Sequence, residues 1–167
     1  LKAMMTEISE ICKEKDLRVF FADAQSVNGI QTSIIHVTAH GEVKKEQLLA
    51  SRSAKADEEI ILVKWIGMEG TLRIMREEGT VLAERFAPGF LNKLEDMRDE
   101  IFSDRAMEIA GRNGVSAMHP IGEGGILAAL WDMAEGAGIG LSVEMKKMTV
   151  RQETIEVCEV FHLNPYQ

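Results

Sequence analysis

The sequence predicts a protein of mixed α and β structure, in which helices alternate with short strands. Two observations predict this class. Apolar residues recur at helical spacing in several segments, and other apolar runs are short and end at glycine or turn residues. The 167 residues are enough for one domain with a sizeable core, or for one domain and part of another.

The N-terminal part of the chain is predicted to hold one helix and two strands. Residues 2–15 form an amphipathic pattern, in which Met4 and Ile8 lie on one face. The apolar run 19–21 predicts a short strand. Residues 34–43 alternate between apolar and polar side chains, which is typical of a half-buried strand.

A polar stretch at 44–59 separates this part from the rest of the chain. We therefore place a domain boundary after residue 44, which gives domains 1–44 and 45–167. The next run, 60–66, is almost continuously apolar and predicts a buried central strand that ends at Gly67.

The second part of the chain is predicted to be mainly helical, with two further strands. One helix follows Gly67, and Leu72 and Met75 face inward from it. The helix at 126–135 is apolar nearly all round, so we expect it to be buried. The remaining helices are predicted at 91–97, 103–110 and 152–161, and the remaining strands at 115–118 and 139–145.

Composition and charge exclude several classes of function. Nineteen basic against 27 acidic residues give a formal net charge of −8, which argues against a nucleic-acid partner. No apolar run is long enough to span a membrane, and no signal-peptide pattern is present. Cys12 and Cys158 are expected to be buried thiols rather than a disulfide, and we expect a cytoplasmic protein.

The glycine-rich segment before the helix at 126–135 is the best candidate for a binding site. Amide N–H groups at a helix N-terminus are unpaired, and glycines let a phosphate approach them closely. Gly122, Gly124 and Gly125 meet both requirements. The alternative is a tight turn that packs the buried helix close to a sheet, and Glu123 is a poor neighbour for an anion unless a metal ion or a lysine compensates.

Histidines are the second class of candidates. His119 stands beside the glycine-rich segment, where it either contacts a phosphate or donates a proton, or else hydrogen-bonds to the loop. His36 and His40 lie about 13 Å apart on an expected strand, too far for one metal ion. We therefore predict no metal site from histidine spacing, and no pattern favours a Ser-His-Asp arrangement.

Several segments resemble the AIR synthase superfamily, especially its hydrogenase maturation protein E and AIR synthase-related branches. Residues 118–126 read Met-His-Pro-Ile-Gly-Glu-Gly-Gly-Ile, and the family segment reads Met-His-Asp-x-Thr-x-Gly-Gly-[Val/Ile]. Residues 128–140 are similar to the helix and the Glu-Ala-Ser-Gly-Val-Gly stretch that follow it. Residues 57–61 and 66–70 resemble the Gly-Asp-x-[Val/Ile]-Ile and Ile-Gly-x-x-Gly segments.

The resemblance implies a fold and a chemistry. It implies α+β domains with helices layered on a mixed sheet: residues 1–44 would be the end of an ATP-binding-type N-terminal domain, and 45–167 the C-terminal domain. It further implies ATP and Mg²⁺ as cofactors, a phosphate or nucleotide ligand, ATP-dependent ligase or phosphoryl-transfer chemistry, and a homodimer. The expected ligand-contacting residues are His119, Gly122, Gly124, Gly125 and, less directly, Asp23.

This chain also departs from the family pattern. Pro120 stands where the family has Asp, and Gly122 where it has Thr, so a carboxylate and a hydroxyl are lost. Asp23 and Gln25 are the polar groups in the stretch that aligns with the family's Gly-Gly-His-Thr-Glu.

The resemblance also concerns the ends of the chain. The family's Asp-rich ATP- and Mg²⁺-binding segment would precede Leu1, and its last strands would follow Gln167. We therefore expect a fragment that does not catalyse by itself. The alternative is a non-catalytic binding or regulatory member that kept the fold.

Overall fold

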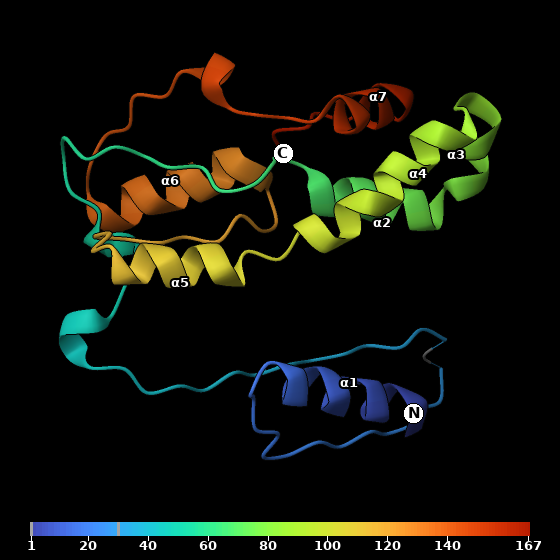
Figure 1. The fold of residues 1–167 in the computed structure, drawn as a ribbon, viewed down its shortest axis with the longest axis horizontal. Helices are drawn as coiled ribbons and strands as arrows, with labels where there is room; N and C mark the ends of the chain where they lie inside the picture. Colours follow the sequence, from blue (N-terminus) through green and yellow to red (C-terminus); the bar gives the residue numbers. More distant parts are fainter. Residues whose placement is uncertain (1, 30) are drawn as a thin grey trace. The chain divides into compact units, whose positions relative to one another are not determined.

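The computed structural model describes residues 2–29 and 31–167, which form two separate units (Figure 1). The first unit comprises residues 1–41 and the second residues 42–167. No helix among the described residues is long and apolar enough to cross a membrane.

The first unit contains the helix α1, Lys2–Glu14, as the amphipathic pattern predicts. No residue of α1 is buried. The chain that follows is extended, and its apolar side chains face solvent: Phe20 is 87% and Phe21 is 84% exposed. This unit therefore lacks a core among its described residues.

The second unit is built from helices joined by turns and extended segments. Its elements run in the order η1 Lys45–Gln47, η2 Ser51–Ser53, α2 Met68–Glu77, α3 Gly79–Arg85, α4 Pro88–Asp96, η3 Met97–Glu100, α5 Asp104–Arg112, α6 Gly125–Ala137, η4 Met145–Lys147 and α7 Gln152–Val160. The helices expected near 72–75, 91–97, 103–110, 126–135 and 152–161 are confirmed, and α3 is an additional helix that the sequence analysis missed.

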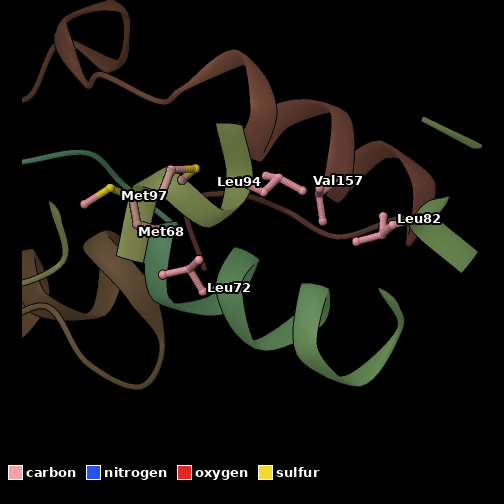
Figure 2. Close-up of a cluster of buried hydrophobic side chains, with 6 residues drawn as sticks. All are labelled: Met68, Leu72, Leu82, Leu94, Met97 and Val157. Atoms are coloured by element: carbon pink, nitrogen blue, oxygen red, sulfur yellow. The ribbon is translucent and has the colours of Figure 1, made fainter. Parts of the chain in front are cut away.

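The main core lies among α2, α3, α4, η3 and α7 (Figure 2). We call it the helical cluster. Its side chains are exposed by no more than 8%, and Leu82, Leu94, Met97 and Val157 are fully buried. The full set is Met68, Leu72, Leu82, Leu94, Met97 and Val157.

A buried polar contact joins α2 to α7 beside the helical cluster. The Thr71 hydroxyl donates to the Gly67 carbonyl at 2.7 Å and lies 3.2 Å from the Thr154 hydroxyl. Gly67 has a φ of +75° at the start of α2, and a Cβ there would lie 2.9 Å from Cγ2 of Thr154. Gly67 therefore permits both the backbone turn and the close approach of α7.

A second, smaller core surrounds α6, and we call it the α6 cluster. It consists of Ile66, Ile126 and Leu130, against which half-buried side chains from extended segments pack. The expectation that α6 is buried all round is not met, since Trp131 is 69% exposed.

The α+β fold class, with helices on a mixed sheet, is wrong for this structure. The described residues contain a single isolated bridge, a parallel one between Ile66 and Val150, and no sheet. The expected strands 19–21, 34–43, 60–66, 115–118 and 139–145 do not form: apart from the Ile66–Val150 bridge their residues have no ladder partners, and Lys64 has a φ of +69°.

The physical reason is that an apolar extended segment becomes a strand only when a neighbour takes its backbone hydrogen bonds. The sequence pattern reports the local preference for extended backbone and not the pairing. Without that pairing, apolar side chains in these segments stay in solvent, as at Val37, which is 78% exposed, and Ile61, which is 77% exposed.

The two cysteines are free. Cys158 is buried on α7, as expected, and burial raises the pKa of its thiol. Cys12 on α1 is half-buried, so the expectation of burial holds for one of the two residues.

Candidate functional site

The glycine-rich segment forms the turn that leads into α6. Gly124 occupies the position before the helix with a φ of +84°, and Gly125 follows with a φ of +68°. The Gly125 amide donates to the Gly122 carbonyl at 3.0 Å, which closes the turn. The left-handed backbone at Gly124 and Gly125 favours glycine, so these two positions have a local structural reason for their residue type.

Part of the α6 N-terminus is already in contact with the end of the chain. The Leu127 amide donates to the Tyr166 carbonyl at 3.4 Å, and a Cβ at Gly125 would lie 2.6 Å from that same oxygen. Gly122 is different, since a Cβ there would meet open space. No side chain caps α6 among the described residues. The open position of the turn is therefore Gly122, since a Cβ at Gly124 would lie 2.7 Å from Cβ of Ala128.

His119 lies between two polar side chains. Its Nδ1 is 2.7 Å from Oγ of Ser51, and its Nε2 is 3.7 Å from Oδ2 of Asp132 on α6. The His119 side chain is 19% exposed, whereas that of Asp132 is 60% exposed. The Ser51 hydroxyl also reaches the Met118 carbonyl at 3.2 Å.

Sequence reasoning missed Ser51 and Asp132. Ser51 belongs to the polar stretch that was interpreted as a boundary, and it is separated from His119 by 68 positions. η2 packs against α6, which brings the two distant segments together. No motif in the sequence signals this contact.

Glu58 accepts two hydrogen bonds at the surface. The Ser116 hydroxyl and the Lys55 amide both donate to its Oε2, the latter at 2.9 Å. The hydrogen bond from Ser116, followed by that from Lys55, lowers the pKa of the Glu58 carboxyl. This contact ties the segment before residue 60 to the segment after α5.

Asp23 belongs to the first unit, where its carboxylate is used locally. It accepts hydrogen bonds from the Ala24 amide and the Gln25 side chain, each at 2.9 Å. Within residues 2–29 and 31–167, no group of three or more His, Cys, Asp and Glu side chains could hold a metal ion.

A wide hollow of about 2980 Å³ opens within the second unit. It is lined by the extended segments around 60–66, 114–126 and 139–144, and His119 and the glycine-rich turn lie on its wall. Ligand pockets for drug-sized molecules are about 300–1,000 Å³. The hollow is therefore too large to be filled by one small molecule, and specificity must come from groups on its wall.

Comparisons with known proteins give a consistent result. Residues 55–165 match the model of the family described as AIR synthase related protein, C-terminal domain. A protein of Methanocaldococcus jannaschii named for hydrogenase expression/formation is 25% identical over 99% of this chain and 47% of its own length. The carbamoyl dehydratase HypE of Rhodobacter capsulatus is 30% identical over 52% of this chain and 25% of its own length.

The chain thus covers less than half the length of these curated relatives. No solved structure matches it. The family match extends over most of the chain and includes the glycine-rich turn, His119 and Asp132. The chain therefore belongs to the AIR synthase related family, whose C-terminal domain it contains at residues 55–165.

Proposed function

We propose that this chain provides a phosphate-binding domain to an ATP-dependent ligase or phosphoryl-transfer protein that acts in hydrogenase maturation. The names of its relatives support the maturation role, since one is assigned to hydrogenase expression/formation and the other is a carbamoyl dehydratase. ATP, Mg²⁺ and a homodimer belong to this proposal through the family resemblance.

The open side of the glycine-rich turn is the observation that carries the binding step. Amides in the first turn of a helix have no intrahelical acceptor, and the helix dipole adds partial positive charge there. A Cβ at Gly122 would meet nothing within 4 Å, so a phosphate can approach the turn from this side. His119, three residues before Gly122, would add positive charge when protonated.

A second candidate is a non-catalytic binding or regulatory member, and a specific contact favours it. The Leu127 amide donates to the Tyr166 carbonyl and the Gly125 amide to the Gly122 carbonyl, so two donors of the α6 N-terminus are used within the chain. Glu123 also adds negative charge to the turn. In this candidate the turn packs the chain end against α6 and binds no anion.

Calorimetric titration with inorganic phosphate, ADP and Mg-ATP separates the two candidates. The test variant is Gly122→Val, because a Cβ at Gly122 meets nothing within 4 Å and the branched side chain would occupy the open side of the turn. The matched control is Gly140→Ala, where a Cβ also meets open space, away from the turn.

We expect all three ligands to bind the unmodified chain and the Gly140 variant, and to bind the Gly122 variant at least about tenfold more weakly. Circular dichroism establishes that both variants are folded. Equal affinity in the two variants would exclude the glycine-rich turn as the anion site. An absence of binding to the unmodified chain would favour the non-catalytic candidate.

A further inference from the structure

We propose that Ser51 is an activated nucleophile, with His119 as its general base and Asp132 as the positioning residue for the imidazole. The three side chains form a chain of contacts: Ser51 Oγ to His119 Nδ1 at 2.7 Å, and His119 Nε2 to Asp132 Oδ2 at 3.7 Å. A nucleophile bonded to a base, which a third group orients, is the arrangement that activates a serine hydroxyl.

The Asp132 carboxylate lies 3.7 Å from Nε2, a position that favours the ring tautomer this role needs. A neutral imidazole carries one proton, and the Asp132 carboxylate favours that proton on the nitrogen facing it, Nε2. Nδ1 is then the acceptor, and the Ser51 hydroxyl can donate its proton to it. Contacts of this kind are often long in a free enzyme and shorten when substrate binds, which accommodates the 3.7 Å separation.

The three residues come from elements that hold them in place. Ser51 starts η2, which packs against α6, and Asp132 lies in the middle of α6. His119 is fixed between them and is mostly shielded, with 19% of its side chain exposed. Asp132 is on the surface, so it acts by orienting the ring and not as a buried charge.

An uncharged acyl group, such as a carboxylic ester, is the substrate class that fits these surroundings. A phosphoryl donor would bring further negative charge beside the Asp132 carboxylate, whereas a carboxylic ester brings none. His119 lies on the wall of the neighbouring hollow, which carries many apolar side chains.

The reaction balances without a metal or a redox partner. Oγ of Ser51 bonds to the acyl carbon while its proton passes to Nδ1 of His119. The bond from the acyl carbon to the leaving oxygen breaks, and that oxygen takes the proton from His119 as an alcohol. Water then attacks the serine ester by the same route, which releases a carboxylic acid and restores the hydroxyl.

A second possible hydrogen bond of the Ser51 hydroxyl gives an alternative to its activation by His119. If the Ser51 hydroxyl gives its proton to the Met118 carbonyl, 3.2 Å away, Nδ1 must be the donor and Ser51 is not activated. The 2.7 Å contact with Nδ1 fits both arrangements, because the donor and acceptor roles of the ring nitrogens depend on the tautomer. The experiment must therefore measure the reactivity of Ser51 and not only its contacts.

Labelling with an alkyl fluorophosphonate tests the proposal on the unmodified chain. This probe forms a stable bond with an activated serine oxygen and releases fluoride, and mass spectrometry locates the adduct. We expect labelling at Ser51 and not at Ser53, a half-buried serine of the same element. Labelling of neither residue, or of both equally, would overturn the proposal.

Variants then assign the roles of the partners. His119→Gln should slow labelling by roughly 10²-fold, the usual range for loss of a general base. Ser53→Ala should leave the rate unchanged. Asp132→Ala should slow labelling at a fixed pH, and Asp132→Glu, which keeps a carboxylate, should restore most of the rate. An unchanged rate in Asp132→Ala would remove Asp132 from the proposal.

The proposal shares His119 with the proposed anion site, and the position of the labelled serine tests it separately.

Discussion

The helical cluster and the α6 cluster differ in how the surrounding backbone is held. The helical cluster lies among four α-helices and η3, whose backbone hydrogen bonds are made within each element. The α6 cluster is covered on one side by extended segments around Leu62, Leu141 and Met148, which have no ladder. A helix makes its backbone hydrogen bonds internally and needs only side-chain contacts from its neighbours. An extended segment also needs neighbouring backbone groups that donate and accept hydrogen bonds.

Hydrogen exchange should reveal this difference most strongly. We expect amides in the middle of α2 and α7 to exchange at least roughly 10²-fold more slowly than those of residues 60–65, because helix amides open only with the cluster. The measurement is amide exchange by mass spectrometry with peptide resolution. Strong protection at 60–65 would contradict the unpaired backbone and would indicate a strand partner in solution.

Truncation of one buried leucine in each cluster compares their packing. Leu94→Ala should lower the free energy of unfolding by about 4 kcal/mol, and Leu130→Ala by about 2 kcal/mol. Leu94 is enclosed by helices that cannot relax easily, whereas the neighbours of Leu130 can move into the space left. Urea unfolding measures both, and Leu127→Ala, at a site 39% exposed, is the control. Equal losses at the two sites would mean that the α6 cluster is as rigid as the helical cluster.

Two glycines, Gly67 before α2 and Gly70 within it, test the packing of the helical cluster in opposite directions. Gly67→Ala should destabilise the protein by about 1–3 kcal/mol, because its Cβ would meet Thr154 at 2.9 Å and its φ is positive. Gly70→Ala should stabilise it by up to about 1 kcal/mol, because alanine favours helix and the site is open. Thermal unfolding of both variants checks the opposite signs. A stabilising Gly67→Ala would show that α7 does not approach α2 so closely.

The smallest expected effect concerns Glu58, which ties two extended segments together. The folded state lowers the pKa of this carboxyl below its usual 4.5. The hydrogen bonds to the ionised Glu58 carboxyl therefore stabilise the folded state fully above pH 4.5. This stabilisation is lost as the pH falls through the lower pKa of the folded state. Glu58→Gln should lower the unfolding midpoint slightly near pH 7 in low salt, and this difference should shrink as the pH falls below 4.5. A pH-independent difference between the two proteins would contradict this assignment.

The helices were predictable from this sequence, whereas the backbone pairing of the expected strands was not. The spacing of Leu72 and Met75, or of Leu94 and Met97, is a local pattern that local hydrogen bonds can satisfy. The run at 60–66 has the composition of a strand, yet only Ile66 pairs, because pairing depends on where residues near 149–150 lie.

The candidate site also has a local part that the sequence predicts and a long-range contact that it does not. The glycine-rich turn before α6 lies where the sequence predicts it, because Gly124 and Gly125 act through their own backbone angles. Whether it binds an anion stays a prediction. The contact of Ser51 with His119 could not be predicted, since it requires η2 to pack against α6 across 68 positions.

The place of Val157 in the helical cluster has a consequence for synthesis of the protein. Leu94 leaves the ribosome 63 residues before Val157 does, a delay of roughly 3–13 s at about 5–20 residues per second. During that interval the apolar faces of α2 and α4 have no α7 to cover them. The nascent chain is then a client for chaperones, and slow stretches of translation after residue 94 would lengthen the period in which it can aggregate.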